Sequence, residues 1–391
     1  MPIDLTAVRN DTPGVAHRIH FNNAGAALVP RPVLDAMVDY LHREAAIGGY
    51  EAADEGAPRL EKVYDGVARL IGAARDEIAL TENATVAWQM AFYAQDFTAG
   101  DRILTARTEY AANYVAFLQV AQRTGAVIEI VPDDVDGVLD VEALRRMIDG
   151  RVKLIAVTWM PTNGGLINPA AEIGTVARTH GIPYLLDACQ AVGQVPVNVE
   201  ALQCDMLSAT GRKFLRGPRG TGFLYVRREL LTRLEPPMLD HFAAPWVAPD
   251  RYEIRPDARR FETWENNYAA RLGLGAAIDY ALDIGLQEIQ GRVQLLAAEL
   301  RDRLATIPGV EVRDLGRDRS AIVSFTITGM DAAAVNSRLF EAGINVSHSS
   351  PASTLLDSAA RSLPTVLRAS PHYYNTSEEI DRLISELGSL R

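Results

Sequence analysis

The sequence predicts an α/β protein: a large, doubly wound and mainly parallel sheet, joined to a smaller α+β unit. Between about residues 30 and 230, helical stretches alternate with short runs that are apolar throughout, as is typical of strands buried on both faces of a parallel sheet. Beyond residue 262 this alternation stops, and a long helical stretch is followed by strand-like runs. We therefore predict a large domain over residues 20–262 and a small domain formed by residues 1–19 and 263–391.

The individual elements follow from hydrophobic periodicity. In the first part, helices are expected over residues 32–47, 60–71, 84–95, 111–124, 141–148 and 170–179, and strands at RILTA, VIEIV, LIAVTWM, IPYLLDAC, DMLSAT and GFLYVRR. Residues 235–262 carry several proline dipeptides and are expected to be irregular. In the second part we expect a helix from about Asn266, strands at VEVRDL, AIVSFTIT, INVSHS and TVLRAS, and helices over 331–342 and 377–390.

Composition limits the class of protein. The chain has 391 residues, of which 48% are hydrophobic and 23% charged, as in ordinary globular proteins. Its net charge of −11 argues against general binding to nucleic acid or anionic membranes. No apolar run approaches the ~20 residues that span a bilayer, and no secretory signal is visible. With two cysteines, no CxxC and no HExxH, we expect a cytoplasmic protein without a disulfide framework, metal site, nucleic-acid partner or membrane partner.

One lysine stands in an unusual place. Of the 39 Lys and Arg residues, three are lysine, and Lys213 lies between the strand DMLSAT and the glycine-rich GPRGTG. Lys62 lies off the apolar stripe of a helix, and Lys153 occupies a strand end, so both suit the surface. An amine can lose its proton and attack a carbonyl to form a Schiff base, which guanidinium does not do. Lys213 is therefore the candidate nucleophile.

Other polar residues follow neighbouring strands, where an open α/β sheet places its functional groups. Asp187 ends the run IPYLLDAC; it suits a helix cap or an ion pair, or else a protonated pyridine nitrogen. The segment NAT, residues 83–85, opens a helix whose N–H groups and dipole favour an anion such as phosphate, although an ordinary N-cap has the same pattern. Thr210 and Arg212 add a hydroxyl and a cation beside the lysine.

Five motifs in order resemble the class V aminotransferase family of fold-type I pyridoxal-phosphate enzymes. That family includes cysteine desulfurases, selenocysteine lyases and isopenicillin N epimerase. The motifs are FNNAG at 21–25, NAT at 83–85, EYAAN at 109–113, DACQ at 187–190 followed by SATGRKFLRGPRGTGFLYV, and LRASPHYYNTSEEIDRL. The resemblance covers nearly the whole chain.

The resemblance implies a cofactor, pyridoxal 5′-phosphate, and a role for each matching residue. Lys213 would bind the cofactor as a Schiff base and then move protons. The residues implied to hold the cofactor are Ala84, Thr85, Tyr110, Asp187, Gln190, Thr210, Arg212 and Lys213. Among them, Asp187 would pair with the ring nitrogen, Gln190 with the ring hydroxyl, and Tyr110 would stack on the ring. Those implied to bind a small amino-acid substrate are Arg368, Thr162 and Asn23, with Arg368 taking the α-carboxylate. The family also implies a homodimer, although FETWENN, residues 261–267, departs from its cross-subunit loop.

One departure bears on the reaction. The loop INVSHSSPASTLLD, residues 344–357, has no cysteine, whereas a persulfide-forming desulfurase of this family carries a mobile thiol there. We do not expect Cys189 or Cys204 to replace it. We therefore expect β-elimination with C–S cleavage of an S-substituted cysteine or its sulfoxide, as in carbon–sulfur lyases such as the ergothioneine-pathway hercynylcysteine sulfoxide lyase. The products would be pyruvate, ammonia and a thiol or sulfenate. An epimerase or aminotransferase is the alternative within the family, and an inactive binding module is the alternative from another class.

Overall fold

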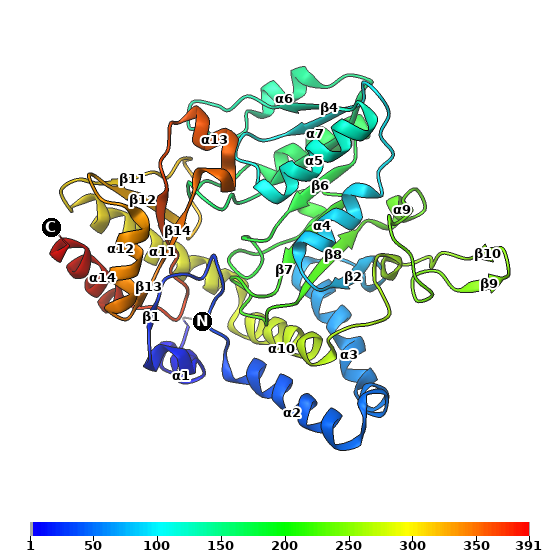
Figure 1. The fold of residues 1–391 in the computed structure, drawn as a ribbon, viewed down its shortest axis with the longest axis horizontal. Coiled ribbons are helices and arrows are strands. Elements are labelled where there is room, and N and C mark those ends of the chain that lie inside the picture. The colour runs from blue at the N-terminus through cyan, green and yellow to red at the C-terminus, as the bar shows by residue number, and fades with distance from the viewer. Residues whose placement is uncertain (1–2, 391) are drawn as a thin grey trace.

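The computed structural model describes residues 3–390 and contains a seven-stranded sheet with a four-stranded sheet beside it (Figure 1). The order in the large sheet is β2-β8-β7-β6-β5-β3-β4. Its strands are β2 Ile78–Thr81, β3 Arg102–Thr105, β4 Val127–Ile130, β5 Val152–Thr158, β6 Tyr184–Asp187, β7 Met206–Thr210 and β8 Gly222–Val226. β8 runs antiparallel to both of its neighbours, and the other adjacent pairs are parallel. The predicted α/β fold class is confirmed.

Helices cover both faces of this sheet because alternate strand residues point to opposite sides. In β5, Leu154 and Ala156 belong to an apolar cluster with the helices α4 and α5. Ile155 and Val157 belong to a second cluster, with α3, α6, α7 and α10. The helices around the sheet are α2 Arg31–Ile47, α3 Gly49–Ile71, α4 Ala84–Tyr93, α5 Ala111–Thr124, α6 Val141–Met147, α7 Ala170–His180, α8 Val199–Leu202, α9 Arg228–Leu231 and α10 Tyr268–Ile284.

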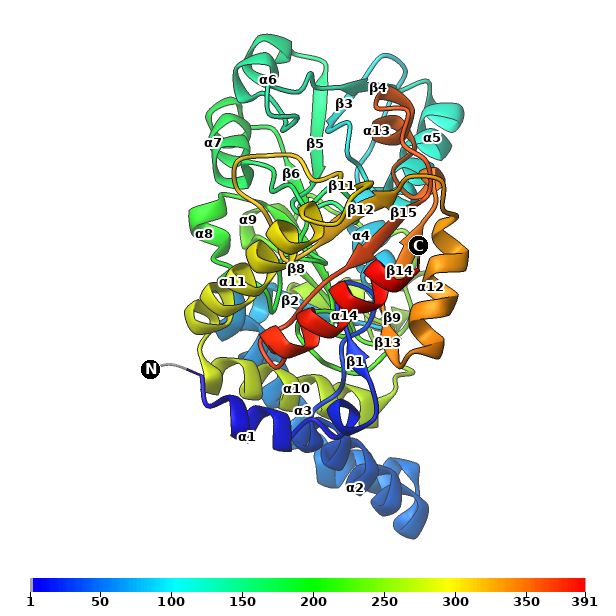
Figure 2. The same cartoon turned by 90° about the vertical axis from the view of Figure 1, so that its left-hand side faces the viewer.

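The four-stranded sheet is antiparallel, in the order β11-β12-β15-β14, and α11, α12 and α14 lie on its outer face (Figure 2). A short parallel pair, β1 with β13, joins the start of the chain to this part. The bounds are α1 Leu5–Asn10, β1 Ile19–His20, α11 Leu286–Ala305, β11 Val310–Val312, β12 Val323–Ile327, α12 Ala332–Glu341, β13 Ile344–Asn345, β14 Ser347–Ser349, α13 Leu355–Ala360, β15 Val366–Ala369 and α14 Ser377–Ser389. Short 3₁₀ turns are Pro13–Ala16, Arg75–Glu77, Ala258–Phe261 and Pro351–Thr354.

Some elements differ from those expected from the sequence. The helix predicted over 60–71 begins at Gly49 and runs through Pro58, because its earlier turns bury Ala52 in a small cluster with Tyr40. The strand β2 and the helices α1 and α11 were not predicted. The region expected to be irregular contains the hairpin of β9 Trp246–Ala248 and β10 Arg251–Tyr252, which extends from the body of the protein (Figure 1).

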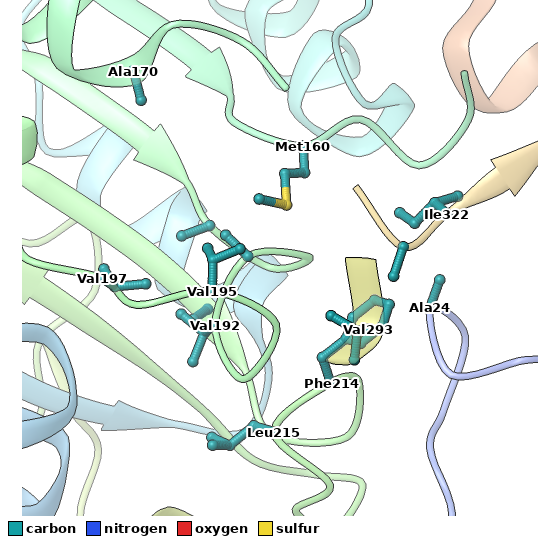
Figure 3. Close-up of a cluster of buried hydrophobic side chains, with 14 of the residues drawn as sticks. Ala24, Met160, Ala170, Val192, Val195, Val197, Phe214, Leu215, Val293 and Ile322 are labelled. Carbon is teal, nitrogen blue, oxygen red and sulfur yellow. The ribbon is translucent and has the colours of Figure 1, made fainter. Parts of the chain in front are cut away.

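One apolar core connects the two sheets. It includes Phe214 and Leu215, which follow β7, together with Val293 of α11 and Ile322 next to β12 (Figure 3). The segment that carries Lys213 is therefore anchored by packing immediately after the lysine. Within residues 3–390, no helix combines the length and apolar character needed to cross a membrane.

Candidate active site

A pocket lies at the carboxyl ends of the parallel strands, where β5 ends at Thr158 and β6 ends at Asp187. Its lining residues are Ala84, Thr85, Tyr110, Asn113, Thr158, Met160, Thr162, Asp187, Cys189, Gln190 and Lys213. Seven of the residues chosen from the sequence therefore meet in one pocket. The wall formed by the described residues does not include Asn23, Thr210, Arg212 or Arg368.

Lys213 lies three residues beyond the end of β7, in a tight turn. The turn is closed by two backbone hydrogen bonds, from Arg216 N to the Lys213 carbonyl (2.9 Å) and from Gly217 N to the Gly211 carbonyl (2.7 Å). Burial of the amine lowers the pKa of Lys213; Cys189 and Asp187 oppose this shift, and the guanidinium groups of Arg212 and Arg368 add to it. The neutral, nucleophilic form of the amine is therefore favoured compared with an exposed lysine.

Asp187 presents a buried carboxylate to the same pocket. Its Oδ1 accepts a hydrogen bond from Cys189 N (2.9 Å), and its Oδ2 accepts one from Asn113 Nδ2 (3.0 Å). Within residues 3–390, Asp187 forms no ion pair with a basic side chain. A buried carboxylate without a cation is costly. The site therefore suits a ligand that brings a positive charge, such as a protonated ring nitrogen.

The start of α4 lines the pocket through Ala84 and Thr85. Asn83 caps the helix by accepting from Val86 N (3.0 Å), and the first N–H groups, at Ala84 and Thr85, have no intrahelical acceptor. β8 lies very close to this helix start. A Cβ at Gly222 would be 2.7 Å from the carbonyl carbon of Asn83 and 2.9 Å from Ala84 N, so only glycine fits there.

Thr210 and Arg212 do not line the pocket formed by residues 3–390. Thr210 Oγ1 donates to the Thr221 carbonyl (3.2 Å), and Arg212 Nη1 donates to the Gly25 carbonyl. Both side chains therefore already have protein partners, and their proposed contacts with a phosphate remain predictions.

Gln190 offers an acceptor that the protein leaves unused. Its Nε2 donates to the Ala24 carbonyl (3.1 Å), while its buried Oε1 has no hydrogen-bond partner within residues 3–390. A buried acceptor without a donor is unfavourable unless a ligand supplies one. A ring hydroxyl would supply that donor. The free acceptor, the Asp187 carboxylate and the α4 helix start together fit pyridoxal 5′-phosphate.

Arg368, on β15, is hydrogen-bonded to Thr162, which lines the pocket. Its Nη1 donates to the Thr162 carbonyl (3.0 Å) and to Thr162 Oγ1 (2.6 Å), and its Nε donates to Ser347 Oγ (3.1 Å). Burial lowers the pKa of Arg368 to about 10. Within residues 3–390 no carboxylate pairs with it, and Nη2 donates to no protein acceptor. The guanidinium group is thus held in one orientation and lacks a negatively charged partner, as expected for a site that takes a carboxylate.

Asn23 differs from the other predicted substrate residues. Its Nδ2 donates to the Ser370 carbonyl (2.7 Å) and its Oδ1 accepts from the Tyr374 hydroxyl. The side chain is fully buried and ties the N-terminal segment to the segment after β15. Its predicted contact with substrate stays a prediction.

Sequence reasoning did not select Asn113, Met160 or Cys189 as site residues, although all three line the pocket. Asn113 belongs to the motif EYAAN and lies one helical turn beyond Tyr110, at the start of α5. That spacing places both residues on one side of the helix start. It is the feature of the sequence from which Asn113 could have been predicted as a site residue. No signal in the sequence distinguishes Met160.

Comparison with known proteins identifies relatives along the whole chain. The aminotransferase class-V family model matches residues 19–383. A probable cysteine desulfurase of Methanothermobacter thermautotrophicus is 32% identical over 382 residues, covering 96% of this chain and 95% of the relative. A cysteine desulfurase of Haloferax volcanii is 29% identical, covering 100% and 97%. The apo structure of the cysteine desulfurase from Thermococcus onnurineus NA1 has a TM-score of 0.92 at 28% identity, covering 100% of this chain and 98% of that chain.

These relatives contradict one expectation from the sequence. Because residues 344–357 contain no cysteine, we expected elimination from an S-substituted cysteine and excluded persulfide formation. Relatives that match nearly the full length are instead named cysteine desulfurases. The structure also removes part of the reasoning, because Cys189, which had been set aside, lines the pocket with Lys213. The absence of a thiol from one loop therefore does not exclude sulfur transfer.

Proposed function

Because the chain belongs to the aminotransferase class-V family, we propose that it removes sulfur from cysteine, giving alanine and a persulfide. Its cofactor is pyridoxal 5′-phosphate. In the overall reaction the carbon–sulfur bond of cysteine breaks, the sulfur joins the sulfur of an acceptor thiol, and the β-carbon gains a proton. The observation that carries the proposal is the pocket that brings Lys213 and Asp187 together beside the unpaired Arg368, in a chain whose full-length relatives are named cysteine desulfurases.

The residues of the pocket divide the work. Pyridoxal 5′-phosphate, when bound, supplies an aldehyde for covalent attachment and an electron-withdrawing ring. The start of α4 would hold its phosphate, Gln190 its ring hydroxyl, and Asp187 its protonated nitrogen. Arg368 would bind the α-carboxylate of cysteine with its free Nη2. Lys213, whose pKa is lowered by burial, would accept the proton from Cα and return protons to carbon.

Two thiols can serve as the sulfur acceptor: Cys189 of this chain and an added small thiol such as dithiothreitol. Cys189 lines the pocket, but burial and the Asp187 charge hold the pKa of its thiol well above the ordinary value. A neutral thiol is a weak nucleophile. Comparing wild type with Cys189→Ser in the presence of added dithiothreitol separates the sources. Loss of sulfide release assigns the acceptor role to Cys189, and retention assigns it to the added thiol.

Product analysis tests the proposed function. The holoenzyme is incubated with cysteine and dithiothreitol, and alanine, sulfide, pyruvate and ammonia are measured together. Equal amounts of alanine and sulfide are expected, and Lys213→Ala should form neither. Pyruvate and ammonia in place of alanine, or turnover that requires an added 2-oxo acid, would contradict the proposal.

We also propose that the protein is a homodimer. The side chains of Leu34, Val38 and Leu41 are exposed on α2, at spacings that place them on one face of the helix. Trp246 is exposed on the β9–β10 hairpin. Light scattering should give a mass twice that of the 42.6 kDa chain. The double variant Leu34→Glu/Leu41→Glu should have a lower measured mass, closer to that of the monomer. A monomeric wild type would contradict this.

A further inference from the structure

A second buried carboxylate, Glu109, lies behind Asp187 and has no role in the reaction described above. Glu109 is 3% exposed and is the last residue before Tyr110, which caps α5. It does not line the pocket. Within residues 3–390 no Lys, Arg or His forms an ion pair with it. A buried acidic group without a counter-charge is rare, so its presence next to the site calls for a cause.

Hydrogen-bond donors surround Glu109. Its Oε1 accepts from Tyr110 N (2.9 Å), Asn113 Nδ2 (2.9 Å) and the Thr158 hydroxyl. Its Oε2 accepts from Thr158 N (3.0 Å) and Thr105 Oγ1 (3.1 Å). Two backbone N–H groups and one amide NH₂ can only donate, so this cage matches the ionised carboxylate. Burial raises the pKa of Glu109, with the Asp187 charge adding to the rise, while the hydrogen bonds from Thr158 and Asn113 oppose it.

Asn113 connects the two carboxylates. Its Nδ2 carries two hydrogens, one directed at Glu109 Oε1 (2.9 Å) and one at Asp187 Oδ2 (3.0 Å). The reversed amide would place its oxygen against two carboxylate oxygens, so the orientation of Asn113 is set by its neighbours. Because Glu109 is itself fixed by β3, β5 and α5, the amide holds Asp187 in one position.

We propose that Glu109 and Asn113 are positioning residues: Asn113 aims the Asp187 carboxylate at the cofactor ring nitrogen, and the Glu109 charge increases the proton affinity of that nitrogen. The negative charge acts on the ring through the Asn113 amide and Asp187 without touching the ring. This inference rests on the cofactor and is independent of the substrate. Removal of the charge should therefore change the bound cofactor before any amino acid is added.

The pKa of the ring nitrogen, followed by the nitrogen-15 chemical shift of holoenzyme carrying labelled pyridoxal 5′-phosphate while the pH is varied without substrate, tests this role. Glu109→Gln preserves the size of the side chain and removes its charge. Asn113 and Asp187 separate Glu109 from the ring nitrogen, and a unit charge at roughly 8 Å with an effective dielectric constant of about 20 shifts a pKa by about one pH unit. Glu109→Gln should therefore lower the midpoint of the ring-nitrogen titration by about one pH unit. Asn113→Leu should shift it in the same direction, and Glu109→Asp, which keeps the charge, should restore most of the wild-type midpoint.

Glu379→Gln is the matched control. Glu379 is also buried and also accepts from an asparagine amide, Asn375 Nδ2 (2.8 Å), but it caps α14 in the four-stranded-sheet part of the chain. This variant should lower thermal stability, since it also loses the ion pair of Glu379 with Arg9 (2.8 Å), and leave the ring-nitrogen midpoint unchanged. If Glu109→Gln and Asn113→Leu also lower stability with an unchanged midpoint, Glu109 is structural and the proposal is wrong. Should Glu109→Gln fail to fold, the same decision follows from Asn113→Leu and Glu109→Asp.

Discussion

Replacing Arg368 should remove most of the affinity for amino acids while leaving the cofactor in place. In the structure Nη1 and Nε are used by Thr162 and Ser347, which leaves both hydrogens of Nη2 for a carboxylate. Truncating one partner of a buried, hydrogen-bonded charge pair costs about 2–5 kcal/mol. The dissociation constant of an amino acid should therefore rise about 30- to 4000-fold in Arg368→Gln. Arg368→Lys should lie between wild type and Arg368→Gln, because it keeps the charge and loses the planar fork.

The measurement is a titration of the holoenzyme with alanine, followed by the absorbance of the bound cofactor. Cysteamine, which is cysteine without its carboxylate, is the ligand control, and its affinity should change less than threefold in Arg368→Gln. Arg260→Gln is the protein control. Arg260 is a buried arginine that donates to the Leu231 and Leu234 carbonyls away from the pocket. Unchanged affinity for alanine in Arg368→Gln, or an equal loss for alanine and cysteamine, would refute the assignment of the carboxylate site.

Two further predictions concern charge. Asp187→Asn should lower kcat for sulfur release by about 10²-fold or more, because the ring nitrogen loses its partner; steady-state kinetics at saturating cofactor should show this, and a change below threefold would contradict it. Acid should destabilise the protein through His372, whose Nδ1 accepts from Tyr373 N (2.9 Å) while burial holds its pKa well below 6.5. Below about pH 6.5 the unfolded chain binds a proton that the folded chain does not. The free energy of unfolding should therefore fall by up to about 1.4 kcal/mol for each pH unit below 6.5 because of His372, whereas above pH 6.5 this residue causes no loss. Urea titrations from pH 7 to 5 should show a flatter decline in His372→Asn than in wild type, and parallel declines would contradict this origin.

The residues that could be predicted from the sequence are those whose place depends on one strand. Asp187 and Lys213 each follow a run of buried residues, and parallel strands bring their carboxyl ends to one edge of a sheet. Gln190 follows Asp187 in the same short segment. For such residues, local pattern and fold class are sufficient to predict convergence.

Contacts between separate elements could not be predicted in this way. The hydrogen bond from Asn113 to Asp187 depends on the angle at which α5 leaves its loop, which no local pattern encodes. Asn23 belongs to a motif that suggests a substrate contact, yet pairing of its neighbour Asn22 with Ser370 directs its side chain into the protein. The early start of α3 has the same kind of cause, because burial of Ala52 against Tyr40 outweighs the helix-breaking tendency of Pro58.

Reductive trapping of the cofactor is the most direct measurement of the chemistry assigned to Lys213. The holoenzyme is treated with borohydride, digested and sequenced by mass spectrometry. Because the chain has three lysines, the modified position can be assigned without ambiguity. A single phosphopyridoxyl group on Lys213 is the expected result. Modification at Lys62 or Lys153, or no stable adduct after incubation with pyridoxal 5′-phosphate, would contradict the assignment of Lys213 and with it the proposed reaction.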